Sequence, residues 1–296
     1  MVSYWKSEFD INDAMVKTTG ISAIKNVMED SVKAHKIGDV EVGSFLSSGI
    51  DSSYIAALSK VDKTFTIGYV NEKYNEGNVV ERFAKLMNIQ SHVCCVKPEE
   101  FWENISKVQY YMDEPLADAS AVAFYMLNRE AAKRVKVCLS GEGADELFGG
   151  YNIYKEPYMC KWYDRIPKIV RCSVGTIAKL LPSMPGVNFL VRHSLPLQER
   201  YIGNTCLFHE KQKKKILKHY SGKVYPMDVI RAECGEMDNL DDVTRMQMTD
   251  IRMWLAGDIL LKADKMSMAN SMELRVPFLD KEVFSYKVFA ENAGGT

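Results

Sequence analysis

The stretch that decides the fold is EVGSFLSSGIDSSYIAALSK, residues 41–60. Its first part, through Leu46, is an apolar run of strand formers, which Ser47–Gly49 interrupt before a helical pattern begins at Tyr54. The first turn of a helix has free N–H groups, and the helix dipole adds about half a positive charge there. A strand that passes through such a turn into a helix therefore predicts an anion-binding site.

Asp51 gives this loop a more specific chemistry. Hydroxyl donors surround it, namely Ser47, Ser48, Ser52 and Ser53. A carboxylate at this place repels phosphate unless a Mg²⁺ ion lies between the two groups. The loop has no GxxxxGK[ST] pattern, so it is not a Walker A loop. A serine-rich turn with an acidic residue at a helix start is the purely structural alternative, but the combination favours a polyphosphate that carries its metal ion.

The residues around this stretch predict a parallel sheet. Further strands are expected at 64–69, 92–96 and 135–139, and helices at 21–34, 79–87, 98–112 and 119–134. Short connections and right-handed crossovers turn this alternation into an α/β fold, a parallel sheet with helices on both faces.

After residue 154 the strand signals stop, and the expected helices are 155–165, 167–181, 195–219 and 242–270. We therefore expect a lead-in over 1–20, an α/β lobe over 21–153 and a helical lobe over 154–296.

Composition indicates the class of protein. The 296 residues are 47% hydrophobic and 26% charged with a net charge of −1, so bulk charge predicts neither a nucleic-acid nor a membrane partner. The basic run 211–215 lacks interleaved aromatic residues and is interpreted as a solvated helix face. Seven cysteines without a CxxC pair indicate reduced thiols rather than zinc ligands. With no 18-residue apolar run and no signal-peptide core, a cytoplasmic location is expected.

A second loop of the same kind, Ser140-Gly141-Glu142-Gly143-Ala144-Asp145-Glu146, follows the strand at 135–139. The carboxyl ends of parallel strands meet at one sheet edge, where open α/β sheets bind ligands. Asp51 and Asp145 are therefore expected to hold one Mg²⁺ ion, with Glu142 near the reacting phosphate as a base or electrostatic group. The alternative is that these acids cap the helix that starts at 145.

Four motifs carry a resemblance to a known family. LSSGIDSS (46–53) resembles the PP-loop SGGxDS of ATP pyrophosphatases, with Ser48 in place of the first glycine, where a positive φ would strain it. SGEGADELFGGY (140–151) is similar to the signature of the synthetase domain of glutamine-dependent asparagine synthetases. DEPLADASA (113–121) resembles the middle segment of that family and KMSMANSMELRVPFLD (265–280) its later signature, and the four motifs occur in the family's order.

The resemblance covers roughly residues 20–285 and implies the PP-loop ATP pyrophosphatase fold, which is adenine nucleotide alpha-hydrolase-like. It implies the synthetase half of an asparagine synthase that uses ATP and Mg²⁺. In that family the β-carboxylate of L-aspartate attacks the α-phosphorus of ATP to give β-aspartyl-AMP and pyrophosphate, and ammonia then displaces AMP. The residues carried over are Ser47, Gly49, Asp51 and Ser52 for pyrophosphate, Leu46 and Ile67 for adenosine, Ser140 and Gly141 for the nucleotide, Asp51 and Asp145 for Mg²⁺, and Glu142 as the base for ammonia.

Two departures from the family affect these expectations. Val2 follows Met1 where full members have the nucleophilic cysteine of a glutaminase domain, so we expect no such domain here and ammonia from another domain or subunit. The sequence ends sixteen residues after Asp280, so the family's lysine that stabilises the adenylating transition state has no counterpart. The helical lobe is therefore expected to be truncated.

Several alternatives stay open from sequence. The acceptor could be another carboxylate, as in related β-lactam-forming synthetases or amidotransferases, or the domain could bind nucleotide without turnover. A homodimer is one assembly to consider. Lys262 could face a phosphate or the substrate carboxylate, or could pair with Asp258 at i,i+4.

Overall fold

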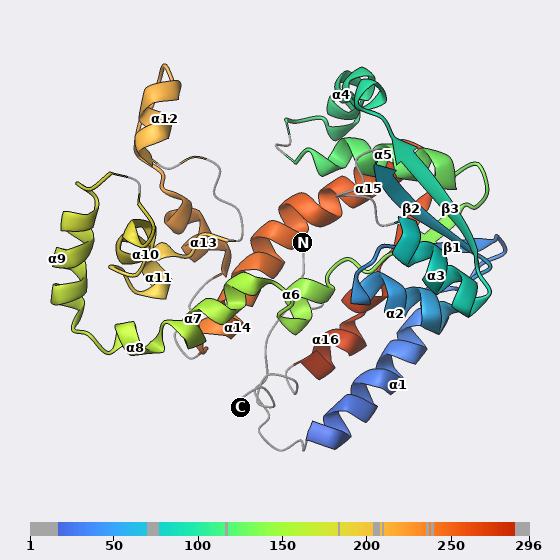
Figure 1. Ribbon diagram of the computed structural model, residues 1–296, viewed down its shortest axis with the longest axis horizontal. Helices are drawn as coiled ribbons and strands as arrows, with labels where there is room; N and C mark the ends of the chain where they lie inside the picture. Colours follow the sequence, from blue (N-terminus) through green and yellow to red (C-terminus); the bar gives the residue numbers. More distant parts are fainter. Residues whose placement is uncertain are drawn as a thin grey trace. The chain divides into compact units, whose positions relative to one another are not determined.

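The computed structural model describes residues 17–69, 77–115, 118–182, 184–203, 208, 210–234, 237 and 240–287. Most of the expected lead-in and Cys206 lie outside these residues. The described chain forms two compact units (Figure 1). The first unit contains the residues up to Phe148 together with those from Asp258 onward, and the second is Gly149–Gly257.

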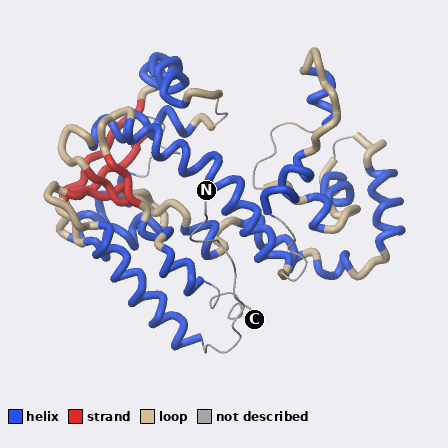
Figure 2. The backbone as a smooth tube through the Cα atoms, turned by 180° about the vertical axis from the view of Figure 1, so that it is seen from behind, coloured by secondary structure: helices blue, strands red, loops and turns tan. Residues whose placement is uncertain are grey.

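A five-stranded parallel sheet is the framework of the first unit (Figure 2). The strands are β1 (Val42–Phe45), β2 (Lys63–Tyr69), β3 (Gln90–Val96), β4 (Val137–Leu139) and β5 (Glu273–Arg275), and their spatial order is β3-β2-β1-β4-β5. Ser44 of β1 is in register with Thr64 of β2 on one side and with Leu139 of β4 on the other. The chain therefore adds β2 and β3 to one side of β1 before it places β4 on the opposite side.

Helices cover both faces of this sheet. They are α1 (Lys17–His35), α2 (Ile50–Ser59), α3 (Gly77–Met87), α4 (Pro98–Met112), α5 (Ser120–Ala131), α6 (Ala144–Phe148), α15 (Leu260–Met268), η4 (Pro277–Leu279) and α16 (Lys281–Lys287). Phe45 packs in a core with Leu127 of α5, whereas the next residue, Leu46, packs with Ala56 of α2 and Val80 of α3. Successive strand residues point to opposite faces, so the two cores confirm the α/β fold predicted from sequence.

The chain from Asp258 onward differs from the sequence expectation. We expected 154–296 to form one helical lobe, but β5 pairs with β4, and Met266 of α15 and Met272 are fully buried in the cores of the first unit. A three-residue strand has too little alternation to be predicted, and the helical pattern of 242–270 runs across the boundary between the units without a break.

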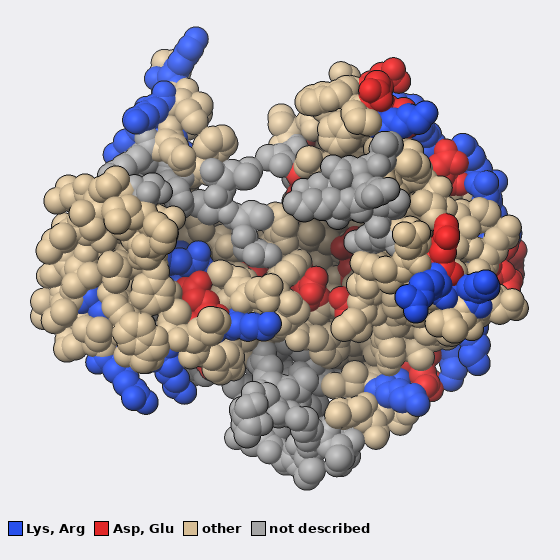
Figure 3. Space-filling model, in the orientation of Figure 1, with Lys and Arg blue, Asp and Glu red and all other residues tan. Residues whose placement is uncertain are grey.

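The described residues of the second unit form helices and the loops between them, with no strand. The unit contains η2 (Asn152–Lys155), α7 (Glu156–Met159), α8 (Lys161–Asp164), α9 (Lys168–Ala178), α10 (Val187–Arg192), α11 (Leu197–Arg200), α12 (Glu210–Ile216), α13 (Pro226–Cys234) and α14 (Asp242–Thr249). The run continues as a ten-residue π-helix, η3 (Asp250–Ile259), into α15. Lys214 and Lys215 of α12 are exposed, as expected for a solvated helix face, and basic side chains gather at the surface of this unit (Figure 3). Among the described helices, none is both long and apolar enough to cross a membrane.

Glu156 is an acid of the second unit that three basic side chains surround. Its carboxylate lies 3.1 Å from the Nη2 of Arg192 and 3.1 Å from the Nε2 of His193, and it also accepts a hydrogen bond from Arg200. Burial raises the pKa of Glu156, but the hydrogen bond from His193 and the charges of the two arginines outweigh burial and lower the pKa to about 2. The carboxylate is therefore a structural anion of this unit.

Candidate active site

The two Ser/Gly/acid loops meet at the carboxyl edge of the sheet, as the sequence predicts. They follow β1 and β4, the neighbouring strands at which the strand order reverses, and such a point is where open α/β sheets bind ligands. A Cβ atom on Gly141 would lie 3.0 Å from the backbone nitrogen of Ser52 and 3.2 Å from the Cβ of Asp51. A side chain at this position would push the loops apart, so the glycine permits their close approach.

Serine hydroxyls brace the first loop. The Oγ of Ser47 accepts a hydrogen bond from the N–H of Gly49 at 3.1 Å, and the Oγ of Ser52 accepts one from the N–H of Ser47 at 3.0 Å. Gly49 is the N-cap residue of α2 and has an extended conformation. It makes no side-chain capping hydrogen bond to the first turn of the helix. Ser48 is not among the described residues with positive φ, so serine fits this position without strain.

A cavity of about 370 Å³ lies beside these loops, a volume within the range of small-molecule sites. Nine of the ten predicted site residues line it, namely Leu46, Ser47, Gly49, Asp51, Ser52, Ile67, Ser140, Gly141 and Glu142. Asp145, the tenth, is not a lining residue, but its charge acts on Asp51. The cavity therefore joins the two loops that the sequence separates.

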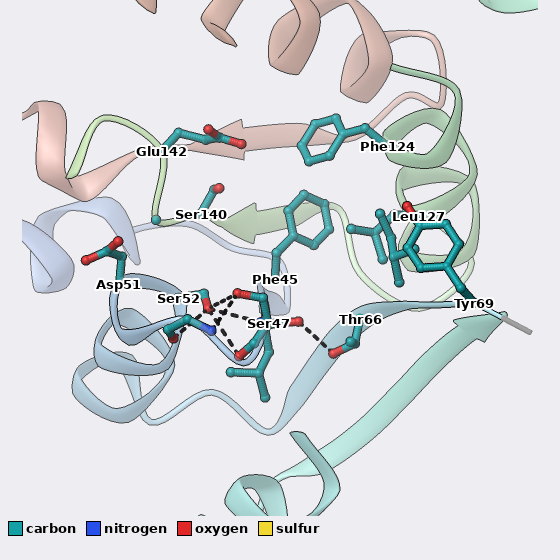
Figure 4. A pocket seen from close by; sticks show the side chains of 14 residues that line it. Phe45, Ser47, Asp51, Ser52, Thr66, Tyr69, Phe124, Leu127, Ser140 and Glu142 are labelled. Atoms are coloured by element: carbon teal, nitrogen blue, oxygen red, sulfur yellow. Dashed lines mark hydrogen bonds between the residues drawn. The ribbon is translucent and has the colours of Figure 1, made fainter. Parts of the chain in front are cut away.

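Sequence reasoning missed the mostly apolar wall of the cavity, to which Phe45, Thr66, Tyr69, Phe124 and Leu127 contribute (Figure 4). The ring of Phe124 meets that of Phe45 edge to face, with centroids 5.4 Å apart. Thr66 donates a hydrogen bond from Oγ1 to the carbonyl of Leu46 at 2.8 Å. In the sequence, Phe124 and Leu127 are spaced so that they lie on one face of a helix. Apolar residues of any core helix have this spacing, so it does not indicate a cavity wall. One end of the cavity is thus apolar and the other carries the loops.

Asp51 and Asp145 form the predicted pair of carboxylates. Burial and then the charge of Asp145 raise the pKa of Asp51, and burial raises that of Asp145. The described residues contain no group of three or more His, Cys, Asp or Glu side chains suited to a metal ion. Mg²⁺ is commonly held by one or two carboxylates together with substrate phosphates and water. This donor set therefore fits a Mg²⁺ ion that arrives with a phosphate ligand.

Glu142 lies at the polar end of the cavity. Burial raises its pKa to about 7, the charge of Lys262 opposes this, and the charges of Glu146, Asp145 and Asp118 reinforce it. In Figure 4 its carboxylate points toward the ring of Phe124. A carboxyl group that titrates near neutral pH can accept and release a proton under working conditions.

Lys262 has a different partner from the one considered at i,i+4. Its Nζ lies 2.6 Å from Oδ2 of Asp118 and donates to the Oγ of Ser120 at 2.8 Å. Burial raises the pKa of Asp118, but hydrogen bonds from Lys262 and Ser120 outweigh it, so the net pKa lies below the ordinary value. The pair joins the start of α5 to α15.

The parallel sheet, the strand reversal and the cavity between the two Ser/Gly/acid loops define an α/β domain of the adenine nucleotide hydrolase-like class. The chain matches the asparagine synthase family over residues 23–288, and it belongs to that family.

Two relatives are asparagine synthetases by name. The chain is 44% identical over 288 residues to "Asparagine synthetase [glutamine-hydrolyzing] 1" of Bacillus subtilis, which covers 95% of this chain and 46% of the relative. It is 46% identical over 267 residues to "Putative asparagine synthetase [glutamine-hydrolyzing]" of Mycobacterium tuberculosis strain H37Rv, which covers 88% of this chain and 41% of the relative. The chain thus spans less than half the length of these curated relatives.

Proposed function

We propose that this chain is the synthetase half of an enzyme that uses ATP to convert L-aspartate to L-asparagine, with release of AMP and pyrophosphate. The observation that carries the proposal is the convergence of the loops after β1 and β4 on one cavity that has an apolar end and three carboxylates beside its polar end. Membership of the asparagine synthase family supports the choice of reaction.

In this proposal the apolar end holds the adenosine. Leu46 and Ile67 contact the base and ribose, with Ser140 and Gly141 alongside, and the edge-to-face pair Phe45 and Phe124 closes the wall. An aromatic wall suits a planar base because stacking adds to apolar burial.

The braced first loop binds the pyrophosphate part of ATP in this proposal. Ser47, Gly49 and Ser52 present hydroxyl and N–H donors at the N-terminus of α2, where the helix dipole favours an anion. Asp51 and Asp145 would hold Mg²⁺, which supplies positive charge to phosphate oxygens. The loop holds the β and γ phosphates while an oxygen of the substrate β-carboxylate bonds to the α-phosphorus and the bond to the β-phosphate oxygen breaks.

Glu142 acts in the second step. Ammonia attacks the acyl carbon of β-aspartyl-AMP, Glu142 takes a proton from the attacking nitrogen, and AMP leaves with the electron pair of the broken C–O bond. A pKa of about 7 suits this role because the carboxylate and its protonated form are both populated near neutral pH. In this proposal the ammonia comes from glutamine through a glutaminase domain or subunit.

A pyrophosphate-release assay tests the proposal. The chain is incubated with MgATP and, separately, L-aspartate, L-glutamate or no acceptor, with ammonium chloride as the nitrogen source. Pyrophosphate release that requires L-aspartate, with L-asparagine as product, supports the proposal. Release driven by another carboxylate would instead support a related amidotransferase, and binding of MgATP without release would support a nucleotide-binding domain without turnover.

A further inference from the structure

The short helix η4 (Pro277–Leu279) lies beside elements of the candidate active site, and the steps proposed above leave it without a role. It is the PFL part of the motif at residues 265–280. It packs against α1, α6 and α16 within the first unit. Two of its side chains, Phe278 and Leu279, contact the elements that carry the three site acids.

The ring of Phe278 lies against both helices that carry the carboxylate pair. This side chain is buried, and its ring centroid lies 6.4 Å from that of Tyr54 on α2 and 6.0 Å from that of Phe148 on α6. Tyr54 follows Asp51 by three residues, and Phe148 follows Asp145 by three, so each aromatic residue neighbours its acid on one helix face. One ring therefore spans the two helices whose separation sets the distance between the acids.

The side chain of Leu279 covers the backbone of Gly143, the residue after Glu142. A Cβ atom on Gly143 would lie 2.3 Å from Cδ2 and 2.6 Å from Cγ of Leu279, much closer than carbon atoms in contact approach. Gly143 also has a φ of +87°, a conformation that favours glycine. Leu279 therefore restricts the backbone of the second loop at the turn between Glu142 and Asp145.

Hydrogen bonds to α1 hold η4 in place. The Oγ of Ser31 donates a buried hydrogen bond to the carbonyl of Pro277 at 2.8 Å. Arg275, two residues before η4, donates from Nη1 to the carbonyls of His35 at 2.8 Å and Ile37 at 2.7 Å. The last carbonyls of a helix have no partner within it, so the guanidinium completes the end of α1. These bonds involve neither loop, and η4 can therefore support both.

We propose that Phe278 and Leu279 are positioning residues of the candidate active site. Phe278 sets the separation of Asp51 and Asp145, and Leu279 sets the orientation of the turn that carries Glu142. This inference rests on the proposed function for the roles of the three acids. Asp51 and Glu142 come from different loops but lie at the same end of the cavity, where a support common to both loops can act (Figure 4).

Small changes in spacing matter at such a site. Mg²⁺ demands near-octahedral geometry with ligand distances of about 2.1 Å, so two carboxylates share an ion only over a narrow range of separations. A smaller side chain in place of the Phe278 ring lets α2 and α6 move relative to each other, and their acids move with them. Loss of the Leu279 side chain frees the turn but keeps the ring between the helices. The two residues should therefore affect different properties, which a general loss of core packing would not do.

Calorimetric titration of the full chain with α,β-methylene-ATP, in MgCl₂ and separately in EDTA, tests the role of Phe278. In MgCl₂, Phe278→Leu should bind the analogue about tenfold more weakly than the wild type, a typical effect of losing the support behind metal ligands. In EDTA the two chains should agree within about twofold, because the donors at the N-terminus of α2 are unchanged.

A double-variant cycle tests the role of Leu279 without any substrate. Gly143→Ala should lower the temperature of thermal unfolding, because its Cβ overlaps the Leu279 side chain. Leu279→Ala removes the overlapping atoms, so the combined variant should unfold at a higher temperature than Gly143→Ala alone. In single-turnover assays, Leu279→Ala should slow asparagine formation about tenfold more than β-aspartyl-AMP formation, because only the turn beside Glu142 is displaced.

Val108→Ala separates positioning from loss of stability. Val108 is buried in the core between α4 and α5, and its truncation should lower the unfolding temperature as Phe278→Leu does. Its affinity for the analogue in MgCl₂ should nevertheless match that of the wild type. If Phe278→Leu does not fold, Tyr54→Leu and Phe148→Leu, which each remove one of the two ring contacts, decide the question.

Equal losses of affinity for Phe278→Leu in MgCl₂ and in EDTA, or a loss as large for Val108→Ala, would overturn the role of Phe278. A combined variant less stable than Gly143→Ala would overturn the role of Leu279. No Mg²⁺-dependent binding by the wild-type chain would overturn both roles. A Mg²⁺-specific loss in Phe278→Leu, together with no pyrophosphate release by the wild-type chain in the assay above, would leave the inference standing and contradict the proposed reaction.

Discussion

Glu156 in the second unit and the acids at the sheet edge of the first unit show opposite uses of a carboxylate. Two arginines and a histidine contact Glu156, and its pKa is lowered to about 2. At the sheet edge, burial raises the pKa of both Asp51 and Asp145, the charge of Asp145 raises the pKa of Asp51 further, and the pKa of Glu142 is raised to about 7. The protein neutralises the first group itself and leaves the second group for a ligand to neutralise.

Whether basic side chains of the protein neutralise a carboxylate distinguishes structural acids from functional ones. The type of residue, Asp or Glu, does not. Removing an acid from a neutralised cluster leaves its cations without a compensating negative charge, and this destabilises the fold. Removing one from a group of like charges relieves repulsion and should leave the fold intact or more stable, while the chemistry suffers. Variants at the two places should therefore fail in different ways.

The largest expected effect is at the metal-type pair. Asp51→Asn and Asp145→Asn should each lower Mg²⁺-dependent pyrophosphate release by about 1,000-fold, which corresponds to about 4 kcal/mol. The reason is that an amide cannot supply the negative charge that a Mg²⁺ site needs. Pyrophosphate release over a Mg²⁺ titration measures the effect.

Asp62→Asn is the matched control, because Asp62 is exposed and lies away from the cavity lining. Thermal unfolding of the two site variants should occur at or above the wild-type temperature. If Asp51→Asn and Asp145→Asn each destabilised the fold as much as Glu156→Gln is expected to, the sheet-edge acids would be structural in the same way as Glu156.

The second effect concerns one step of the reaction. Glu142→Gln should leave β-aspartyl-AMP formation within about threefold of the wild-type rate but slow asparagine formation by about 100-fold, a common value for loss of a general base. Single-turnover measurements that follow pyrophosphate and asparagine separately distinguish the steps. Glu99→Gln, an exposed change on α4, is the control. Equal losses in both steps would argue against a base role for Glu142.

A third effect is on stability in the second unit. Glu156→Gln should lower the free energy of unfolding by about 3 kcal/mol, because Arg192 and Arg200 lose the anion that compensates them. Urea denaturation measures the change. Glu199→Gln removes a single pair with Lys168 and should change stability by less than about 1 kcal/mol. Comparable losses in the two variants would mean that Glu156 is no more structural than a surface acid.

The sheet and both loops could be predicted because their signals are local. A short apolar run that ends in serine, glycine and an acid occurs before both Asp51 and Asp145, and parallel strands place such ends at one edge. The apolar wall could not be predicted in the same way. Phe124 has the spacing of an ordinary core residue, and the strand order decides that it borders a cavity.

The partner of Lys262 shows why tertiary contacts cannot be predicted from neighbouring residues in the sequence. The sequence offers Asp258 at i,i+4, but the hydrogen-bonded carboxylate belongs to Asp118, 144 residues away. Likewise β5 depends on pairing with β4 rather than on its own three residues. The domain division expected from sequence, with one helical lobe from residue 154 onward, differs from the observed units for the same reason. The chain from Asp258 onward packs with a sheet whose other strands come from residues before 149.

The smallest expected effect is on pH dependence, and it tests the sheet-edge acids without any ligand. The pKa of Glu142 is raised in the folded chain to about 7 from an unfolded value of about 4.3, so the folded state binds an extra proton between these pH values. Stability from this group is therefore present below about pH 4.3 and is lost as the pH rises toward 7. Because the side chain is partly exposed and screened, the loss should be about 1 kcal/mol rather than the full linkage value. Urea denaturation at pH 5 and pH 8 should show wild-type stability falling relative to that of Glu142→Gln by this amount, whereas parallel stabilities would mean that Glu142 is neutralised within the fold as Glu156 is.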